Sequence, residues 1–220
     1  MTETPTATRG RRRLGTLGSY LGHDNVFVRV VSLWLVGAVL FAVAWITSYY
    51  LLPERALSGV VGSPGMVAAS PDAWATFAQL IVVNLVIGMG GIIFGNHFRI
   101  GSVPVGYVPP LFWAGLYGVF LGTNSFDVSA GGKIAPTLAV VWTRSGVFEI
   151  TAYLILAAAT VGLVVWQKSS VLARTSEKVR RVRDVPLNRW EIVLAMFAFV
   201  LLGVANWQEA ADIVGTLVGS

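Results

Sequence analysis

Three polar residues attract attention because they lie within or beside long apolar runs: Asn84, Arg144 and Glu149. Charged and amide side chains inside a lipid bilayer are rare, energetically costly and often functional. Asn84 is expected near the middle of an apolar helix. There an interhelical hydrogen bond is the leading interpretation, and contact with a substrate or an ion is the alternative. Glu149 is expected in the first turn of another helix, where the helix dipole favours an anion.

Arg144 precedes Glu149 by five residues across a predicted turn, so the two side chains could form an ion pair. A structural pair near the membrane boundary is one interpretation of Glu149. A functional carboxylate that contacts a proton or a peptide is the other. We therefore treat Glu149, Arg144 and Asn84 as candidate contacts for a substrate or a partner.

The sequence lacks the residue sets that are typical of enzymes. It contains no Ser/His/Asp set and no phosphate-binding glycine loop, because the glycines at 88–91 lie inside an apolar run. It has no Cys, which excludes disulfides and thiol chemistry. His23 and His97 have no second ligand at a suitable spacing for a metal. We expect a protein that is not an enzyme, without catalytic residues, metal or cofactor.

Composition indicates which elements hold these residues in place. Of the 220 residues 55% are hydrophobic and 12% are charged, against roughly 25% charged in soluble domains, and the mean hydropathy is +0.70. These values exclude a disordered chain, a fibrous repeat and an ordinary soluble enzyme. They favour an all-α, polytopic membrane bundle. The net charge of +5 comes from residues beside apolar runs, which favours contact with the lipid bilayer rather than nucleic acid.

Five apolar segments are candidates for membrane spans. We expect these spans at 30–52, 77–95, 103–121, 147–166 and 192–206, the last of which could extend toward Val214. A further apolar stretch at 134–142 would cover only ~14 Å as a helix. It is predicted to be a half-helix that is either re-entrant or interfacial. A turn or a broken helix is expected in the first half of the third span, because proline interrupts helices, at Pro104, Pro109 and Pro110.

Basic residues predict the orientation, because positively charged short loops stay in the cytoplasm. With five spans and a cytoplasmic N-terminus, 13 of the 16 Lys and Arg lie inside, and three lie outside: Arg55, Lys133 and Arg144. This arrangement makes the tail at 1–29 and the loop at 167–189 cytoplasmic and places the C-terminus outside. The remainder, 30–220, is expected to be one transmembrane domain.

The N-terminal region also has features of a secretory signal. Basic residues precede an apolar run, and Ala42 and Ala44 form a cleavage-like pattern. The apolar run continues eight residues past Ala44, so an uncleaved signal anchor fits better. We expect a multi-pass protein of a bacterial plasma membrane.

Small residues recur at spacings that let helices approach closely in lipid. Packing within the bundle is the leading interpretation and a dedicated homo-oligomer face is the alternative, at Gly88, Gly91, Gly95, Gly115, Gly118, Gly122, Gly146 and Gly162. The loop at 167–189 alternates Val with Arg. It predicts either a surface helix held by lipid phosphates or a docking site for an acidic partner such as a cytoplasmic ATPase.

The order of these features resembles the stage II sporulation protein M family of bacterial and archaeal membrane proteins. The resemblance covers about residues 77–166 and rests on three stretches: NLVIGMGGIIFG, AGLYGVFLG and RSGVFEITAYLILAAATVGL. The family pattern is Pro-His-Gly, two residues, then Glu, followed by an Ala/Gly-rich helix. Gly146 and Glu149 match it, whereas Arg144 and Ser145 occupy the Pro and His positions. The family's Asn-Gly in the third span is replaced by Ala-Gly at 114–115.

The resemblance implies a role in a membrane complex. The family's namesake works with cell-wall hydrolases during engulfment, other relatives accompany circular-bacteriocin export and immunity genes, and many lie beside ABC-type ATPases. The leading hypothesis is a non-catalytic scaffold or subunit of an envelope membrane complex. The alternatives are a permease-like subunit that works with an ABC-type ATPase in export of, or immunity to, a peptide or other small molecule, and an intramembrane enzyme.

Overall fold

The structure is a computed structural model that describes residues 16–58, 72–125, 132–181, 184 and 187–218. Several features expected on the cytoplasmic side lie outside the described residues: Arg9, Arg11, Arg12, Arg13 and Arg183. Most of the loop between the first two spans, 59–71, lies outside them as well. The described chain is mostly helical.

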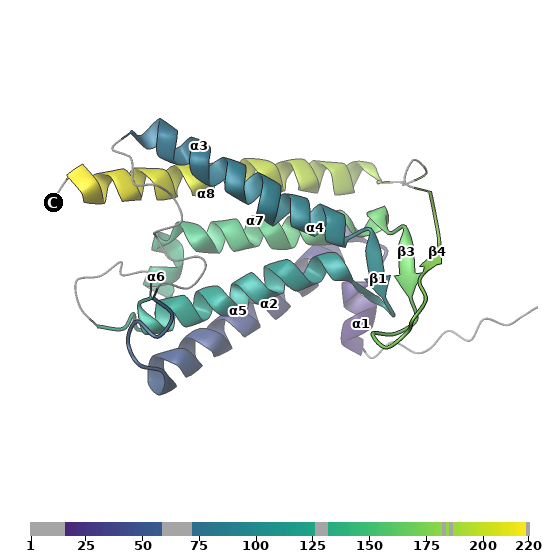
Figure 1. The fold of residues 1–220 in the computed structure, drawn as a ribbon, viewed down its shortest axis with the longest axis horizontal. Coiled ribbons are helices and arrows are strands. Elements are labelled where there is room, and N and C mark those ends of the chain that lie inside the picture. The colour runs from purple at the N-terminus through teal and green to yellow at the C-terminus, as the bar shows by residue number, and fades with distance from the viewer. Residues whose placement is uncertain (1–15, 59–71, 126–131, 182–183, 185–186, 219–220) are drawn as a thin grey trace, which may run out of the picture.

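Four helical segments are long and apolar enough to cross a membrane. The first is α2 (Val26–Leu51). The second is continuous through α3 (Ala73–Val83), the π-helical η1 (Asn84–Met89) and α4 (Gly90–Gly95). The third joins the 3-10 helix η2 (Val105–Tyr107) to α5 (Val108–Thr123), and the fourth is α8 (Arg189–Val218). A shorter apolar helix, α7 (Ser145–Ala159), lies among them (Figure 1).

The helices lie side by side, so the molecule has two ends (Figure 1). The sheet end carries α1 (Thr16–Leu21) and four short strands, β1 (Phe98–Ile100), β2 (Val103–Pro104), β3 (Trp166–Lys168) and β4 (Glu177–Lys178). The strand order is β2-β1-β3-β4, with β1 and β3 parallel and the other pairs antiparallel. The distal end carries α6 (Leu138–Thr143), the start of α7 and the end of α8.

Helix α7 forms the centre of the bundle. Every residue from Ala152 to Ala159 is buried, and α7 packs against α8, α2 and α5. Its alanines allow these close approaches because a methyl group adds little bulk between helix backbones. The surrounding helices expose many apolar side chains, Val86, Leu35 and Val200 among them. This distribution is typical of a bundle in lipid, where the outer surface is as apolar as the core.

Helix α7 is shorter than its expected span at 147–166, because polar groups end it early. The Asn96 side-chain amide donates to the Ala157 carbonyl at 2.9 Å, and the Thr160 hydroxyl donates to the Leu156 carbonyl at 2.7 Å. Conversely, α8 is much longer than the expected 192–206. The half-helix expected at 134–142 is reduced to α6, since Pro136 precedes it. Whether α6 is re-entrant or interfacial stays a prediction.

The interruption expected in the first half of the third span is present, because Pro104 lies in β2 and the 3-10 helix η2 precedes α5. Pro109 and Pro110 lie in the first turn of α5 and do not break it, because the N–H groups there have no partner within the helix anyway. One other expectation differs from the structure. The loop at 167–189 contains the β3–β4 hairpin where a surface helix was one expectation. The small sheet is an addition to the predicted all-α class.

Candidate functional site

The distal half of the bundle contains a set of polar side chains that we call the distal polar cluster: Tyr117, Arg144, Glu149, Tyr153 and Glu209. They come from α5, from the residue between α6 and α7, from α7 itself and from α8. The five side chains are close enough to interact electrostatically. All of them are partly or fully buried among apolar helices.

Glu149 is held from its own helix. The Tyr153 hydroxyl, one turn further along α7, forms a hydrogen bond with the Glu149 carboxylate. This pairing follows from helix geometry, since residues four apart share a face. Tyr153 fits because Gly88 of η1 has no side chain, and a Cβ at Gly88 would lie 2.5 Å from the Tyr153 hydroxyl. The glycine therefore makes room for the tyrosine that positions Glu149.

Arg144 and Tyr117 lie at the start of α7. The backbone N–H of Gly146 donates a hydrogen bond to the Tyr117 hydroxyl, and a Cβ at Gly146 would collide with the Tyr117 ring. Arg144 interacts with Tyr117 electrostatically. Its Nε is buried and has no hydrogen-bond partner among the described residues. The expected Arg144–Glu149 ion pair is absent from the described residues, since Glu149 is bonded to Tyr153.

Glu209 brings a second carboxylate to the cluster from α8. It interacts with Glu149, with Tyr117 and with Tyr153. Two charged carboxylates that interact inside a bundle repel, and this repulsion favours a cation or a proton near them. The arrangement can therefore bind a cationic group or hold a proton.

Asn84 connects the cluster to the second helical segment. Its side-chain amide donates to the Asn206 side-chain oxygen at 2.7 Å, and Asn206 lies one turn before Glu209 on α8. The predicted interhelical hydrogen bond of Asn84 is thus confirmed. Asn84 also begins η1, and π-helical turns inside α-helices are frequent at functional sites. Contact of Asn84, Arg144 or Glu149 with a substrate stays a prediction.

The sheet end contains a second polar group, which we call the sheet-end clasp: Arg29, Asn188 and Glu191. Arg29 and Glu191 form a buried ion pair at 2.5 Å. The Arg29 guanidinium also donates to the carbonyls of Ala158 at 3.1 Å and His23 at 2.8 Å. The clasp therefore ties the starts of α2 and α8 to the end of α7.

Glu191 also takes part in a reciprocal cap of α8. Its carboxylate accepts from the Asn188 N–H at 2.9 Å, while the Asn188 side chain accepts from the Glu191 N–H at 3.0 Å. This is a capping box, in which both groups satisfy backbone donors that the helix leaves unpaired.

Arg99 on β1 has an altered pKa. Burial is the largest cause and lowers the pKa of Arg99, the interaction with Tyr107 raises it, and the interaction with Arg29 lowers it.

The expected packing role of the glycines is seen at several positions. Gly118 lies against the backbone of Phe41, where a Cβ would be 2.5 Å from the carbonyl oxygen, and Gly122 lies directly against Ser48. A Cβ at Gly95 would be 3.0 Å from the backbone of η2, and one at Gly115 would be in ordinary contact with Leu40. Gly91 is different, because nothing lies within 4 Å of the place its Cβ would occupy.

The sequence analysis missed Glu209, Tyr117 and Tyr153 as members of the cluster. Glu209 was detectable, because apolar residues continue past Asn206 to Val214 and so extend the last helix beyond it. The tyrosines carried no signal of their own. Arg29 and Glu191 were also missed as a pair, although Asn188 and Glu191 have the spacing of a capping box.

No family model, curated protein or solved structure matches this chain. The resemblance to stage II sporulation protein M therefore rests on its motif residues alone.

Proposed function

We propose that this chain crosses a bacterial plasma membrane five times and is a permease-like subunit of a membrane complex, with its N-terminus in the cytoplasm. The charges of the described residues support this orientation. Only Arg55, Lys133 and Arg144 belong to the distal end. The sheet end has the rest: Arg29, Arg99, Lys168, Arg174, Lys178, Arg180, Arg181 and Arg189. Since basic segments stay inside, the sheet end is cytoplasmic and the distal end faces outward.

Helix α7 is the crossing that this proposal adds to the four long apolar segments. Its 15 residues span ~22 Å, less than the ~30 Å of a hydrocarbon core. A helix at the centre of a bundle does not have to match the bilayer, because protein rather than lipid surrounds its ends. The distal polar cluster surrounds one end of α7, and Arg29, Asn96 and Thr160 bond its last carbonyls.

The distal polar cluster is the observation that favours a permease-like role. Transporters commonly place substrate sites where a helix is interrupted within the membrane. Here the chain breaks at Arg144 between α6 and α7, and Glu149, five residues further on, interacts electrostatically with Glu209. We assign to this pair the contact with a cationic group of a peptide or other small molecule on the outer side. An ABC-type ATPase would then supply the energy from the cytoplasmic side.

The test is affinity purification of the tagged chain from its native membranes in mild detergent, followed by mass spectrometry. An ABC-type ATPase at near-equal abundance is the expected result. Recovery of cell-wall hydrolases or other envelope proteins without such an ATPase would contradict the permease-like role and favour the non-catalytic scaffold. The Glu149→Gln variant is the matched control, since it removes the acid but should keep the ATPase bound.

The orientation has its own test. A reporter that is active only outside the cytoplasm, fused after Ser220, should be active, and the same reporter fused before Met1 should be inactive. A C-terminal reporter that stays in the cytoplasm would contradict five crossings.

A further inference from the structure

The small sheet has one face that runs from aromatic to basic residues. Phe98, Trp166 and Lys178 occupy paired positions on β1, β3 and β4. Residues paired directly across strands point to the same face. The Lys178 ammonium lies 5.6 Å from the centre of the Trp166 ring, which shows that these two side chains are in contact on that face.

This face continues the lipid-facing surface of the bundle. The Phe98 ring packs edge-on against Phe94 with centroids 5.3 Å apart, and Phe94 is 68% exposed on α4. Helix α4 is the last part of a segment that is long and apolar enough to span a membrane. The row from Phe94 to Lys178 therefore passes from the hydrocarbon-facing surface to a basic edge. Tryptophan beside lysine at such a boundary is typical of the head-group level.

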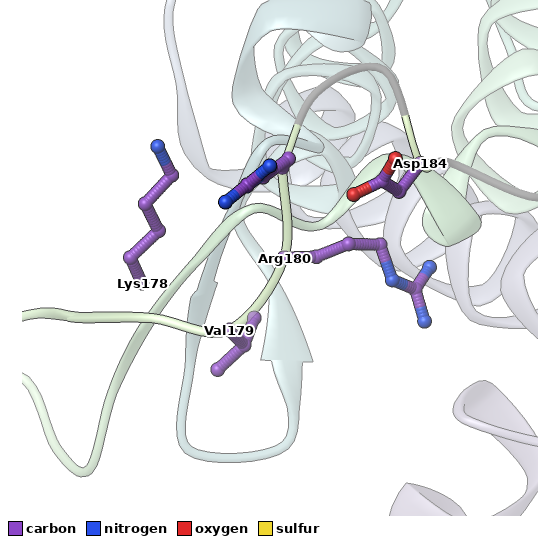
Figure 2. A pocket seen from close by; sticks show the side chains of 5 residues that line it. Lys178, Val179, Arg180 and Asp184 are labelled. Carbon is purple, nitrogen blue, oxygen red and sulfur yellow. The ribbon is translucent and has the colours of Figure 1, made fainter.

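The hairpin beyond this row combines exposed apolar and basic side chains. Val171 and Leu172, in the β3–β4 connection, are 78% and 92% exposed, so two adjacent apolar side chains project from the hairpin. Next to β4, an open hollow is lined by Lys178, Val179, Arg180, Arg181 and Asp184. Figure 2 shows Lys178 and Arg180 extending away from the backbone around this hollow, with the Asp184 carboxylate at its edge.

We infer that the segment from Trp166 to Arg181 binds the head groups of anionic phospholipids in the leaflet next to the sheet end. Trp166 lies at the interface, Leu172 enters the acyl region, and Lys178, Arg180 and Arg181 contact phosphate oxygens. Charge complementarity supports this occupant, since residues 166–181 contain Lys168, Arg174, Lys178, Arg180 and Arg181 against the single acid Glu177. Continuity with the lipid-facing surface at Phe94 favours a lipid over an acidic protein.

This inference needs the sheet end to lie at a membrane surface, but it does not depend on the distal polar cluster or on an ATPase. Its failure would therefore leave the permease-like role untouched. A result that contradicts the permease-like role would likewise not affect the inference that this segment binds lipid.

The first experiment counts lipids bound to the full-length chain by native mass spectrometry. The chain is released from detergent micelles that contain equal amounts of phosphatidylglycerol and phosphatidylcholine. Phosphatidylglycerol should be retained in preference by about tenfold or more, because each basic residue near an anionic surface adds to binding. No preference in the wild-type chain would overturn the inference. Release of phosphatidylglycerol by millimolar inorganic phosphate would also overturn it, because the site would then accept free phosphate.

Two double variants with equal loss of charge provide the control. Lys178→Gln with Arg180→Gln should bring the lipid preference close to one. Arg55→Gln with Lys133→Gln, at the distal end, should leave it unchanged. An equal loss of preference in both variants would show a general charge effect and contradict the assignment. Thermal unfolding in a zwitterionic detergent should be the same for the Lys178/Arg180 variant and the wild type, since both side chains are exposed.

A photo-crosslinking side chain at position 172 distinguishes a lipid from a protein in native membranes. Transfer of the label to phospholipid is expected, because Leu172 is assigned to the acyl region. Transfer mainly to a second protein would overturn the inference and identify a docking site instead.

Discussion

The sheet-end clasp and the distal polar cluster are both polar groups inside an apolar bundle, but their polar atoms are used differently. In the clasp, Arg29 donates to a carboxylate and to backbone carbonyls, and Glu191 accepts from both Arg29 and a backbone N–H. In the cluster, Glu149 and Glu209 repel each other, and the Nε of Arg144 has no partner among the described residues.

This difference in hydrogen bonding indicates two reasons for burying a charged side chain: to hold elements together or to bind a ligand. A buried pair whose hydrogen bonds are all made holds elements in a defined arrangement, and breaking it leaves an uncompensated charge. Like charges brought together in a membrane protein stabilise nothing by themselves, and intramembrane ionisable residues often mark functional sites. On this comparison the clasp serves the fold, and a binding role is proposed for the distal polar cluster.

The largest expected effect is at the clasp. Glu191→Ala leaves the Arg29 guanidinium buried without its carboxylate, so the free energy of unfolding should fall by about 3–5 kcal/mol. The measurement is denaturant-induced unfolding of the purified chain in mixed micelles. Replacing both residues, Arg29→Met with Glu191→Leu, should recover much of the loss, because no unpaired charge remains. Wild-type stability of the single variant would show that the clasp is not structural.

A smaller loss is expected where helices α2 and α5 meet. Gly122→Leu forces a side chain against Ser48 and the backbone of Trp45, which should lower the free energy of unfolding by about 1–3 kcal/mol. Gly91→Leu is the matched control, because the space around Gly91 is open. If both substitutions lower the free energy of unfolding equally, the close contact at Gly122 is not the cause of the loss, which contradicts the structure. The same unfolding assay measures both.

The bond between Asn84 and Asn206 should contribute less. Side-chain hydrogen bonds between membrane helices average about 0.6 kcal/mol, so Asn84→Leu should lower the free energy of unfolding by that order. A double-mutant cycle with Asn206→Leu isolates the pair term. A coupling energy of zero would contradict a direct bond between the two amides.

Sequence patterns predicted the apolar helices and the environment of Asn84, since both depend on local periodicity and on the cost of a polar group in lipid. The prediction that Glu149 lies in the first turn of its helix is wrong, because α7 begins at Ser145 and Glu149 is its fifth residue. The partner of Glu149 was not predicted either, since the choice between Arg144 and Tyr153 depends on the exact residue at which α7 begins. Helix ends are the least reliable part of any such prediction.

Contacts between distant parts of the chain could not be predicted. Arg29 and Glu191 are 162 residues apart, and no periodic pattern links an arginine to one particular glutamate at that separation. The sheet was missed because its strands have only two or three residues, too few to show alternation. Its parallel pair, β1 with β3, also joins segments on either side of α5 and α7.

The most direct test compares two isosteric substitutions, Glu149→Gln and Glu191→Gln, by the free energy of unfolding in the same micelles. If the distal polar cluster exists for binding, Glu149→Gln removes the repulsion from Glu209 and keeps stability within about 0.5 kcal/mol of the wild type or raises it. Glu191→Gln should lower stability clearly, because Arg29 loses its counter-charge. A loss for Glu149→Gln as large as that for Glu191→Gln would make Glu149 a structural residue and contradict the functional assignment of the cluster.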